Sequence, residues 1–532
     1  MKNKYFIFTT FLTALALSLA SCDDYLDLAP DNRAEVDTKD MVASLLVSGY
    51  PTHVFNIISE MASDNMDHRI LPANLSYNYK SQEDAYLWGP SIDETGNDSP
   101  KDVWESFYGC IAVANQALQS IEDMGNTAEL QPQRGEALMI RAYCHLILVN
   151  LFCLHYNEAT SSSDMGIPYM EAPETKLNPY YERGTVAEVY EKIAKDIEEG
   201  LPLIDDNAYI VAPKYHFNRR ASYALASRFY LYYGNYDKAI EYSNVALAGD
   251  LEKILRNMKI FPTLVNDVAT YCREWINPLN ECTYLIMPAY SGTTVFLNYT
   301  TGKLYQHSLF IAENETVRSK GPWNPNAFVA NDWYHKSGLY TSSGYIVYPK
   351  VLYLFEYTDP IAGTGYARGI YPIFTSDEVL LNRAEAYIVK GQYDLATADL
   401  GKWMTNHFTT GVVLTREMIN SYYGEMPYYL PDDPTPKKHL NPLNFSITSA
   451  EQENFLQCLL HFRRIETLYY GLRWFDIKRF GIVIWRRDLT YASDKGDAFE
   501  KVTDILELDD PRRAMQLPSD VISAGLPANP RK

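Results

Sequence analysis

The stretch Gly234-Asn235-Tyr236-Asp237-Lys238-Ala239 decides the fold, because it recurs later in the chain as Gly391-Gln392-Tyr393-Asp394-Leu395-Ala396. Each copy follows an apolar segment with a Tyr four residues before the Gly, at Tyr230 and Tyr387. Glycine readily adopts the left-handed backbone of a tight turn, and a small Ala lets a second helix approach closely. Both stretches therefore predict a pair of helices joined by a tight turn.

This spacing is the tetratricopeptide pattern. The first copy matches the pattern better than the second, in which Trp403 occupies a downstream position that should hold a small residue. Helix pairs of this kind bury their apolar faces only against neighbours. We therefore expect two further, degenerate repeats near residues 103–156 and 449–480. The repeat helices as a whole are predicted over about 103–249 and 376–480.

Between the two blocks of repeats lie residues 250–374, which are rich in Gly, Pro, Asn and Tyr and show no sustained helical period. A long segment of this kind inside a helical protein usually carries function. The sequence thus predicts a mainly α protein, in which tetratricopeptide-like helical repeats support an irregular, loop-rich ligand-binding half. Residues 41–532 are expected to form one domain.

The N-terminus predicts export and lipidation. Lys2 and Lys4 precede an apolar run that is too short to cross a bilayer, so residues 1–21 form a signal peptide. The run ends in Leu19-Ala20-Ser21-Cys22, which resembles a bacterial lipobox; the alternative is an ordinary signal peptide followed by a chance Cys. Lipid on Cys22 would anchor the protein, and the acidic residues 22–40 would form a flexible tether.

Composition argues against two classes of protein, disordered chains and nucleic-acid-binding proteins. The chain has 532 residues, a net charge of -20 and 47% hydrophobic residues, so it is long and apolar enough to fold. Its acidic balance argues against a nucleic-acid ligand, because a phosphate backbone is bound through clustered Lys and Arg. The 43 tyrosines are unusual, and Tyr suits both cores and wet recognition surfaces.

No motif indicates catalysis, a bound metal or a cofactor. The His and Cys residues lack metal-ligand spacing, and no nucleophile elbow or phosphate-binding loop is present. The acidic stretch Asp93–Asp98 is interpreted as a solvated turn. A calcium-binding loop is the less favoured alternative, because the stretch lacks the spacing of an EF-hand. Cys272 and Cys282 flank a loop and are candidates for a disulfide. The sequence gives no evidence of an enzyme.

Four segments together resemble the SusD/RagB family of outer-membrane lipoproteins. They are the start Cys22-Asp23-Asp24-Tyr25-Leu26-Asp27, the helix Arg134-Gly135-Glu136-Ala137 to Arg141-Ala142-Tyr143 with Leu151-Phe152, the block Glu378 to Tyr387, and Arg463-Arg464-Ile465-Glu466 with Gly471-Leu472-Arg473-Trp474-Phe475-Asp476-Ile477-Lys478-Arg479-Phe480-Gly481. The position before Gly471, usually acidic in the family, is Tyr470. Arg473, Asp476 and Arg479 keep helical spacing and are expected to pair, in a structural role.

The resemblance implies a binding protein of Bacteroidetes, facing outward from the outer membrane and held there by its lipid alone. Such proteins sit as lids on a SusC-like TonB-dependent β-barrel transporter. They capture oligosaccharides for import or, in RagB-like members, peptides. From the residues themselves two other classes stay open: a scaffold whose repeats bind a partner protein, and, more remotely, a lipoprotein hydrolase.

The resemblance also implies where the ligand binds, because the family's ligand face is built from an early loop and the middle insertion. Flat aromatic faces suit sugar rings, and carboxylates suit sugar hydroxyls. The candidate ligand-binding residues are Asp64, Tyr77, Tyr79, Trp88, Trp275, Trp323, Trp333 and Tyr334. Each aromatic taken alone is also consistent with core packing, whereas for the group we expect at least one ligand contact. Three other tryptophans, Trp104, Trp403 and Trp474, are expected in the helical core.

Overall fold

The computed structural model of the chain describes residues 36–70, 78–90, 97–175, 180–293, 303–335, 338–340, 345–492 and 496–531. Residues Lys39–Lys532 form one compact unit. Helix α3 (Lys39–Val47) opens this unit, so the last residues of the expected tether are already helical. The signal peptide and Cys22 lie outside the described residues.

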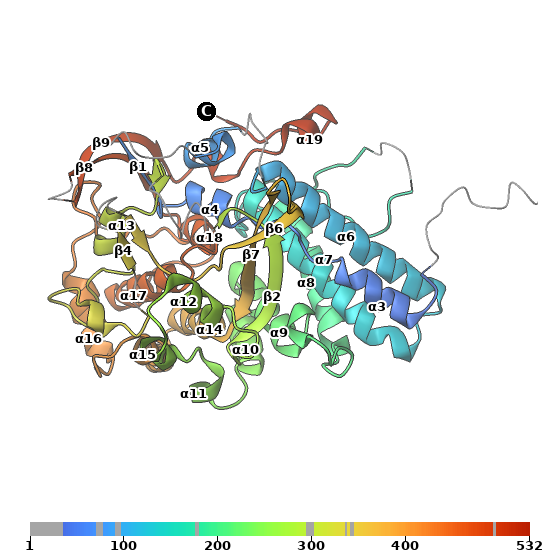
Figure 1. The fold of residues 1–532 in the computed structure, drawn as a ribbon, viewed down its shortest axis with the longest axis horizontal. Helices are drawn as coiled ribbons and strands as arrows, with labels where there is room; N and C mark the ends of the chain where they lie inside the picture. Colours follow the sequence, from blue (N-terminus) through green and yellow to red (C-terminus); the bar gives the residue numbers. More distant parts are fainter. Residues whose placement is uncertain are drawn as a thin grey trace, which may run out of the picture. The chain divides into compact units, whose positions relative to one another are not determined.

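Long helices dominate the unit (Figure 1). In chain order the repeat helices are α6 (Pro100–Asp123), α7 (Gln131–Phe152), α8 (Val186–Gly200), α9 (Arg219–Tyr232), α10 (Tyr236–Ala246), α14 (Ser376–Val389), α15 (Tyr393–His407), α17 (Ala450–Glu466) and α18 (Leu472–Arg479). The shorter helices are α4 (Asn56–Ala62), α5 (Lys80–Tyr86), α11 (Leu251–Ile254), α12 (Val268–Trp275), α13 (Leu309–Asn314), α16 (Arg416–Glu425) and α19 (Ser519–Ser523).

The two sequence repeats are helix pairs, as predicted. The turn between α9 and α10 contains Gly234 at φ +80°, and the turn between α14 and α15 contains Gly391 at φ +71°. Consecutive helices pack against each other from α6 to α8 and from α9 to α10, and α10 packs on α14. The small residues Ala239 and Ala396 are fully buried, which allows the close approach that the pattern predicts.

Helix α7 lies at the centre of the first block of repeats. Among the described residues, the stretch Ala128–Phe152 is the one helix long and apolar enough to cross a membrane, and its apolar 18-residue window is completely buried inside the protein. Its neighbours α6 and α8 cover it, and α3 contacts it as well. Its apolar character is therefore that of a core helix.

Three small sheets complete the described part of the fold. One has the strand order β3-β1-β8-β9, in which β1 runs parallel to β8 and antiparallel to β3. The second is antiparallel, with the order β2-β7-β6, and the third pairs β4 with β5. The strands are β1 (Asp67–Arg69), β2 (Thr283–Tyr290), β3 (Tyr305–Gln306), β4 (Gly338–Tyr340), β5 (Tyr345–Val347), β6 (Leu354–Asp359), β7 (Thr364–Thr375), β8 (Ile484–Ala492) and β9 (Gly496–Leu506).

The middle segment is more ordered than the sequence predicts. Residues 250–374 hold α11, α12, α13 and strands β2 to β7, and the long β7 leads directly into α14. Trp275, expected in an irregular stretch, is the last residue of α12. In Figure 1 the sheet β2-β7-β6 lies between helices α6 to α9 and the sheet that contains β8 and β9. Cys272 and Cys282 are both buried and are not joined by a disulfide, so this candidate pairing is wrong.

Candidate ligand-binding site

Asp64, which follows α4, is held in an ion network. Arg473 on α18 donates two hydrogen bonds of 2.8 Å, from Nε and Nη2, to its two carboxylate oxygens. Arg464 and Lys438 lie 3.5 and 3.8 Å from Oδ2. Burial raises the pKa of Asp64, but Arg464, Arg473 and Lys438 together hold it well below its usual range. The carboxylate is thus ionised and already paired within the protein.

Glu315 is the second acid of the same network. Its Oε2 accepts from Lys438 Nζ at 2.6 Å and from Arg464 Nη1 at 2.7 Å, and Oε1 accepts from Arg487 Nη2 at 3.3 Å. Burial raises the pKa of Glu315, yet Lys438, Arg464 and Arg487 lower it to about 2. Arg487 also pairs with Asp67 on β1. The network therefore ties α17 and β8 to the early loop.

Trp88, just after α5, is 4% exposed. Its Nε1 donates to the Ala62 carbonyl at 2.8 Å. The guanidinium carbon of Arg486 lies 4.1 Å from the ring centroid, and that of Arg512 lies 5.3 Å from it. In this structure the indole is thus packed against cations of the protein.

Trp323 and Trp333 come together in a buried aromatic cluster. They are 2% and 3% exposed, and their ring centroids are 5.8 Å apart. Phe408 stacks on Trp323 at 4.0 Å and lies 4.2 Å from Trp333. The backbone amide of Tyr334 donates to the His407 carbonyl at 3.1 Å, and its side chain is half-buried.

Trp275 lies in a neighbouring core cluster, against which Tyr334 also packs. Its Nε1 donates to the Tyr470 hydroxyl at 2.6 Å, and the guanidinium carbon of Arg256 lies 4.0 Å from the ring centroid. Only 1% of the residue is exposed. Trp104, Trp403 and Trp474 are buried too, as predicted for helical core residues.

Tyr79 is the one aromatic candidate that lies largely in solvent among the described residues, with 52% of its surface exposed. It precedes α5, whose Lys80 and Glu83 are also partly exposed. Nearby, His68 stacks on Tyr305 at 4.9 Å, and the Tyr305 hydroxyl donates to Glu83 Oε1 at 3.2 Å. Tyr79, Lys80, Glu83 and His68 form a mixed aromatic and polar surface, here called the Tyr79 face, and the buried Tyr305 contacts it through His68 and Glu83. Tyr77 lies outside the described residues.

An apolar groove of about 290 Å³, which no pattern in the sequence predicts, runs beside α6. It is lined by Trp104, Tyr108, Tyr181 and Leu526, among others. Glu174 and Asn115 add polar groups to its wall. Its aromatic and polar lining makes the groove a second place where a small ligand fits. The segments that build it lie far apart in sequence, so no local pattern points to it.

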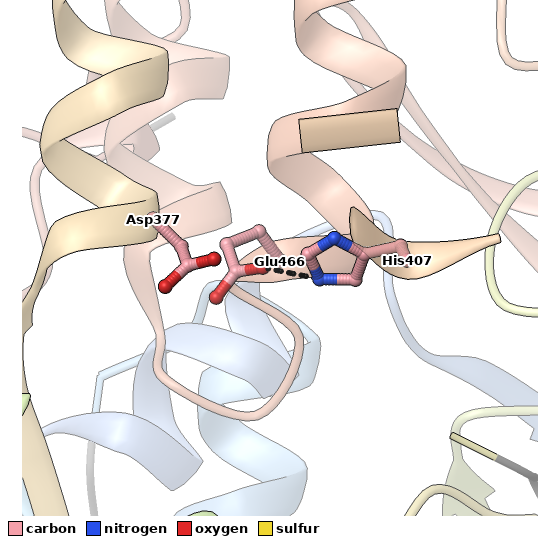
Figure 2. A group of neighbouring side chains, drawn as sticks. All are labelled: Asp377, His407 and Glu466. Carbon is pink, nitrogen blue, oxygen red and sulfur yellow. Dashed lines mark ion pairs between the residues drawn. The ribbon is translucent and has the colours of Figure 1, made fainter. Parts of the chain in front are cut away.

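One group of side chains in the described residues has the composition of a metal site. Asp377, His407 and Glu466 each offer a ligand atom within 4.8 Å of the other two (Figure 2). All three residues are buried. They come from three different helices, so no spacing motif in the sequence could reveal them.

Two family models match the chain. The model described as "Starch-binding associating with outer membrane" matches residues 24–231, and the SusD family model matches residues 293–520. No curated protein is similar enough to match.

Solved structures share the fold. A SusD superfamily protein from Bacteroides thetaiotaomicron VPI-5482 is 19% identical with a TM-score of 0.61, and the alignment covers 93% of this chain and 100% of that one. A SusD-like carbohydrate binding protein from Bacteroides vulgatus ATCC 8482 is 16% identical with a TM-score of 0.58, over 92% and 96% of the two chains. With both halves of the sequence matched and the fold shared, the chain belongs to the SusD/RagB family.

Proposed function

We propose that the protein is a glycan-binding lipoprotein of the bacterial surface that captures oligosaccharides and delivers them to a SusC-like TonB-dependent transporter. The observation that carries this proposal is the match of starch-binding and SusD family models to residues 24–231 and 293–520. The B. vulgatus relative described as a carbohydrate binding protein supports the same ligand class. The role is binding, without catalysis.

The lipobox ending at Cys22 supports a place in the outer membrane. Lipid on this residue would hold the protein at the surface, and the acidic stretch after it would let the folded unit move relative to the membrane. Anchoring through lipid alone leaves residues 39–532 free to cover and uncover a transporter.

We place the oligosaccharide on the Tyr79 face. A half-exposed tyrosine ring offers a flat apolar surface to the C–H side of a pyranose. Lys80, Glu83 and His68 supply donors and acceptors beside it. Asp64 and the four candidate tryptophans are packed inside the protein, and their ligand contacts stay a prediction that would require this packing to open.

The test of the whole proposal is a pull-down of the tagged, lipidated protein from native outer membranes in mild detergent, with mass spectrometry of everything retained. We expect a TonB-dependent barrel together with oligosaccharide. The same barrel with peptides would replace the glycan by a peptide ligand, as in RagB-like members. Recovery of the protein alone would overturn delivery to a transporter and leave a free-standing surface binding protein.

A further inference from the structure

The ends of three repeat helices meet at Asp377, His407 and Glu466. Asp377 is the second residue of α14, and His407 and Glu466 are the last residues of α15 and α17. Their exposed fractions are 0%, 1% and 4%. Figure 2 shows the imidazole directed toward the Glu466 carboxylate, with the Asp377 carboxylate on the other side of Glu466.

The protonation of His407 follows from its contacts. Its Nδ1 lies 2.9 Å from the carbonyl oxygen of Trp403, which can only accept a hydrogen bond, so Nδ1 carries a proton. In the neutral ring Nε2 then has a lone pair, and this atom lies 3.2 Å from Glu466 Oε2. Two lone pairs at that distance repel each other unless a cation stands between them.

Asp377 presents an oxygen without a hydrogen-bond partner. Its Oδ2 accepts from the Arg256 amide and the Ser376 hydroxyl, both at 3.1 Å, whereas Oδ1 is buried and accepts no hydrogen bond from any described residue. A buried polar atom left unpaired is costly, because it has lost its contact with water and gained nothing in return. Together with His407 Nε2, this oxygen forms an acceptor-rich spot in the core that a metal ion would satisfy.

The charges around the group also favour a cation. Asp377 and Glu466 place two buried carboxylates within 4.8 Å of each other. A cation between carboxylates held this close offsets their mutual repulsion.

The nearby cations are directed at other groups. Lys350 Nζ donates to the carbonyls of Ile465 and Glu466 at 2.9 and 2.6 Å. Arg256 Nη1 donates to the Trp275 carbonyl at 2.6 Å. Both side chains thus bond to carbonyl oxygens rather than to the two carboxylates.

We propose that Asp377, His407 and Glu466 bind a divalent transition-metal ion, zinc by the preference of imidazole and carboxylate ligands, which ties α14, α15 and α17 together. In a tetrahedral zinc site with bonds of about 2.0–2.1 Å the ligand atoms lie about 3.3–3.4 Å apart. The 3.2 Å between His407 Nε2 and Glu466 Oε2 is close to this range. The group is wider at Asp377, so binding draws that side chain inward. The site is structural and does not depend on glycan binding.

The experiment uses the full lipoprotein in detergent, purified without chelators or a His tag. We expect elemental analysis to find close to one zinc per chain, and the zinc-depleted protein to bind added Zn²⁺ and melt at a higher temperature with it. Co²⁺ should give visible absorption bands of four- or five-coordinate metal without a thiolate band, because no Cys belongs to the group. Folded wild-type protein that binds neither Zn²⁺ nor Co²⁺ would overturn the proposal.

His407→Gln and Asp377→Asn should weaken Zn²⁺ binding by more than the roughly 10- to 100-fold that loss of an outer hydrogen-bond partner causes. His461→Gln is the matched control: His461 is equally buried, but it contacts Ser319 and Tyr423 and no carboxylate. It should bind zinc as the wild type does. Wild-type affinity in both His407→Gln and Asp377→Asn would overturn the proposal and leave a hydrogen-bonded imidazolium or buried water in the group.

Discussion

Arg473 on α18 donates two hydrogen bonds of 2.8 Å to Asp64, a residue 409 positions earlier in the chain. This contact fixes the loop after α4 to the C-terminal signature of the family. The partners are only 2% and 11% exposed, so solvent screens the pair little.

Asp64→Asn should therefore destabilise the protein. Loss of the acid leaves Arg473, Arg464 and Lys438 with too little counter-charge in a buried site, and breaking such a pair typically costs about 3–5 kcal/mol. Urea unfolding measures the change. Glu171→Gln serves as the control, because it removes an ion pair with Lys192 whose side chains are 47% and 41% exposed. That change should stay within about 1 kcal/mol, and equal losses in the two variants would contradict the argument.

Acid should weaken the same network through Glu315. The ordinary pKa of a glutamate is 4.5, and the surrounding cations lower that of Glu315 to about 2 in the folded protein. A lowered carboxyl pKa contributes stability in full above the unfolded value, and this contribution is lost as the pH falls from about 4.5 toward 2. We expect the difference in unfolding free energy between wild type and Glu315→Gln to shrink between pH 6 and pH 3. A constant difference over this range would contradict the assignment.

The repeats could be predicted from sequence because their signal is local. Gly234 and Gly391 stand at turns with positive φ, and the apolar positions around them recur with the helical period. The sheets carry no such signal. Strand β1 has three residues, and it pairs His68 with Asp488 at the other end of the chain. Only the folded helices bring these partners together.

In the candidate site, too, the sequence predicts local structure but not the contacts between distant residues. Pro, Gly and Asn around Trp323 indicate a loop, and it is one, but the sequence does not reveal that Phe408 covers the ring. Pairing within the signature was predicted, and Arg479 does pair with Asp476 at 2.7 Å. Arg473 instead reaches Asp64. Tyr470, at the usually acidic position, accepts a hydrogen bond from Trp275 rather than making an ion pair.

Gly471→Ala should cost more stability than Gly391→Ala, although both glycines have nearly the same φ, +74° and +71°. A left-handed non-glycine residue costs roughly 1–2 kcal/mol, which we expect for Gly391, where an added Cβ meets nothing within 4 Å. At Gly471 the Cβ would lie 2.9 Å from Ser59 Cβ, so about 1–3 kcal/mol of overpacking is added. Thermal and urea unfolding of both variants give the comparison. Equal losses of stability in the two variants would show that the chain near α4 shifts to accept the added Cβ at little energetic cost.

Trp333→Ala should lower the free energy of unfolding. Truncating a buried tryptophan costs roughly 3–5 kcal/mol, since the cavity against Trp323 and Phe408 cannot close completely. Tyr357→Ala, at a side chain 58% exposed, should change the unfolding free energy by no more than about 0.5 kcal/mol. A Trp333→Ala protein that keeps its stability but loses oligosaccharide affinity would instead place Trp333 in the ligand site.

Tyr79→Ala should weaken oligosaccharide binding by about 3- to 10-fold, because an aromatic contact contributes roughly 0.5–1.5 kcal/mol beyond burial. Tyr79→Phe keeps the ring and should retain most of the affinity. Calorimetric titration with the oligosaccharide recovered from native membranes measures both. Tyr180→Ala is the control, since Tyr180 is 70% exposed and lies beside Gly525, near the C-terminus. If Tyr79→Ala binds normally while Tyr181→Ala does not, the ligand lies in the groove beside α6, and the Tyr79 face is not the site.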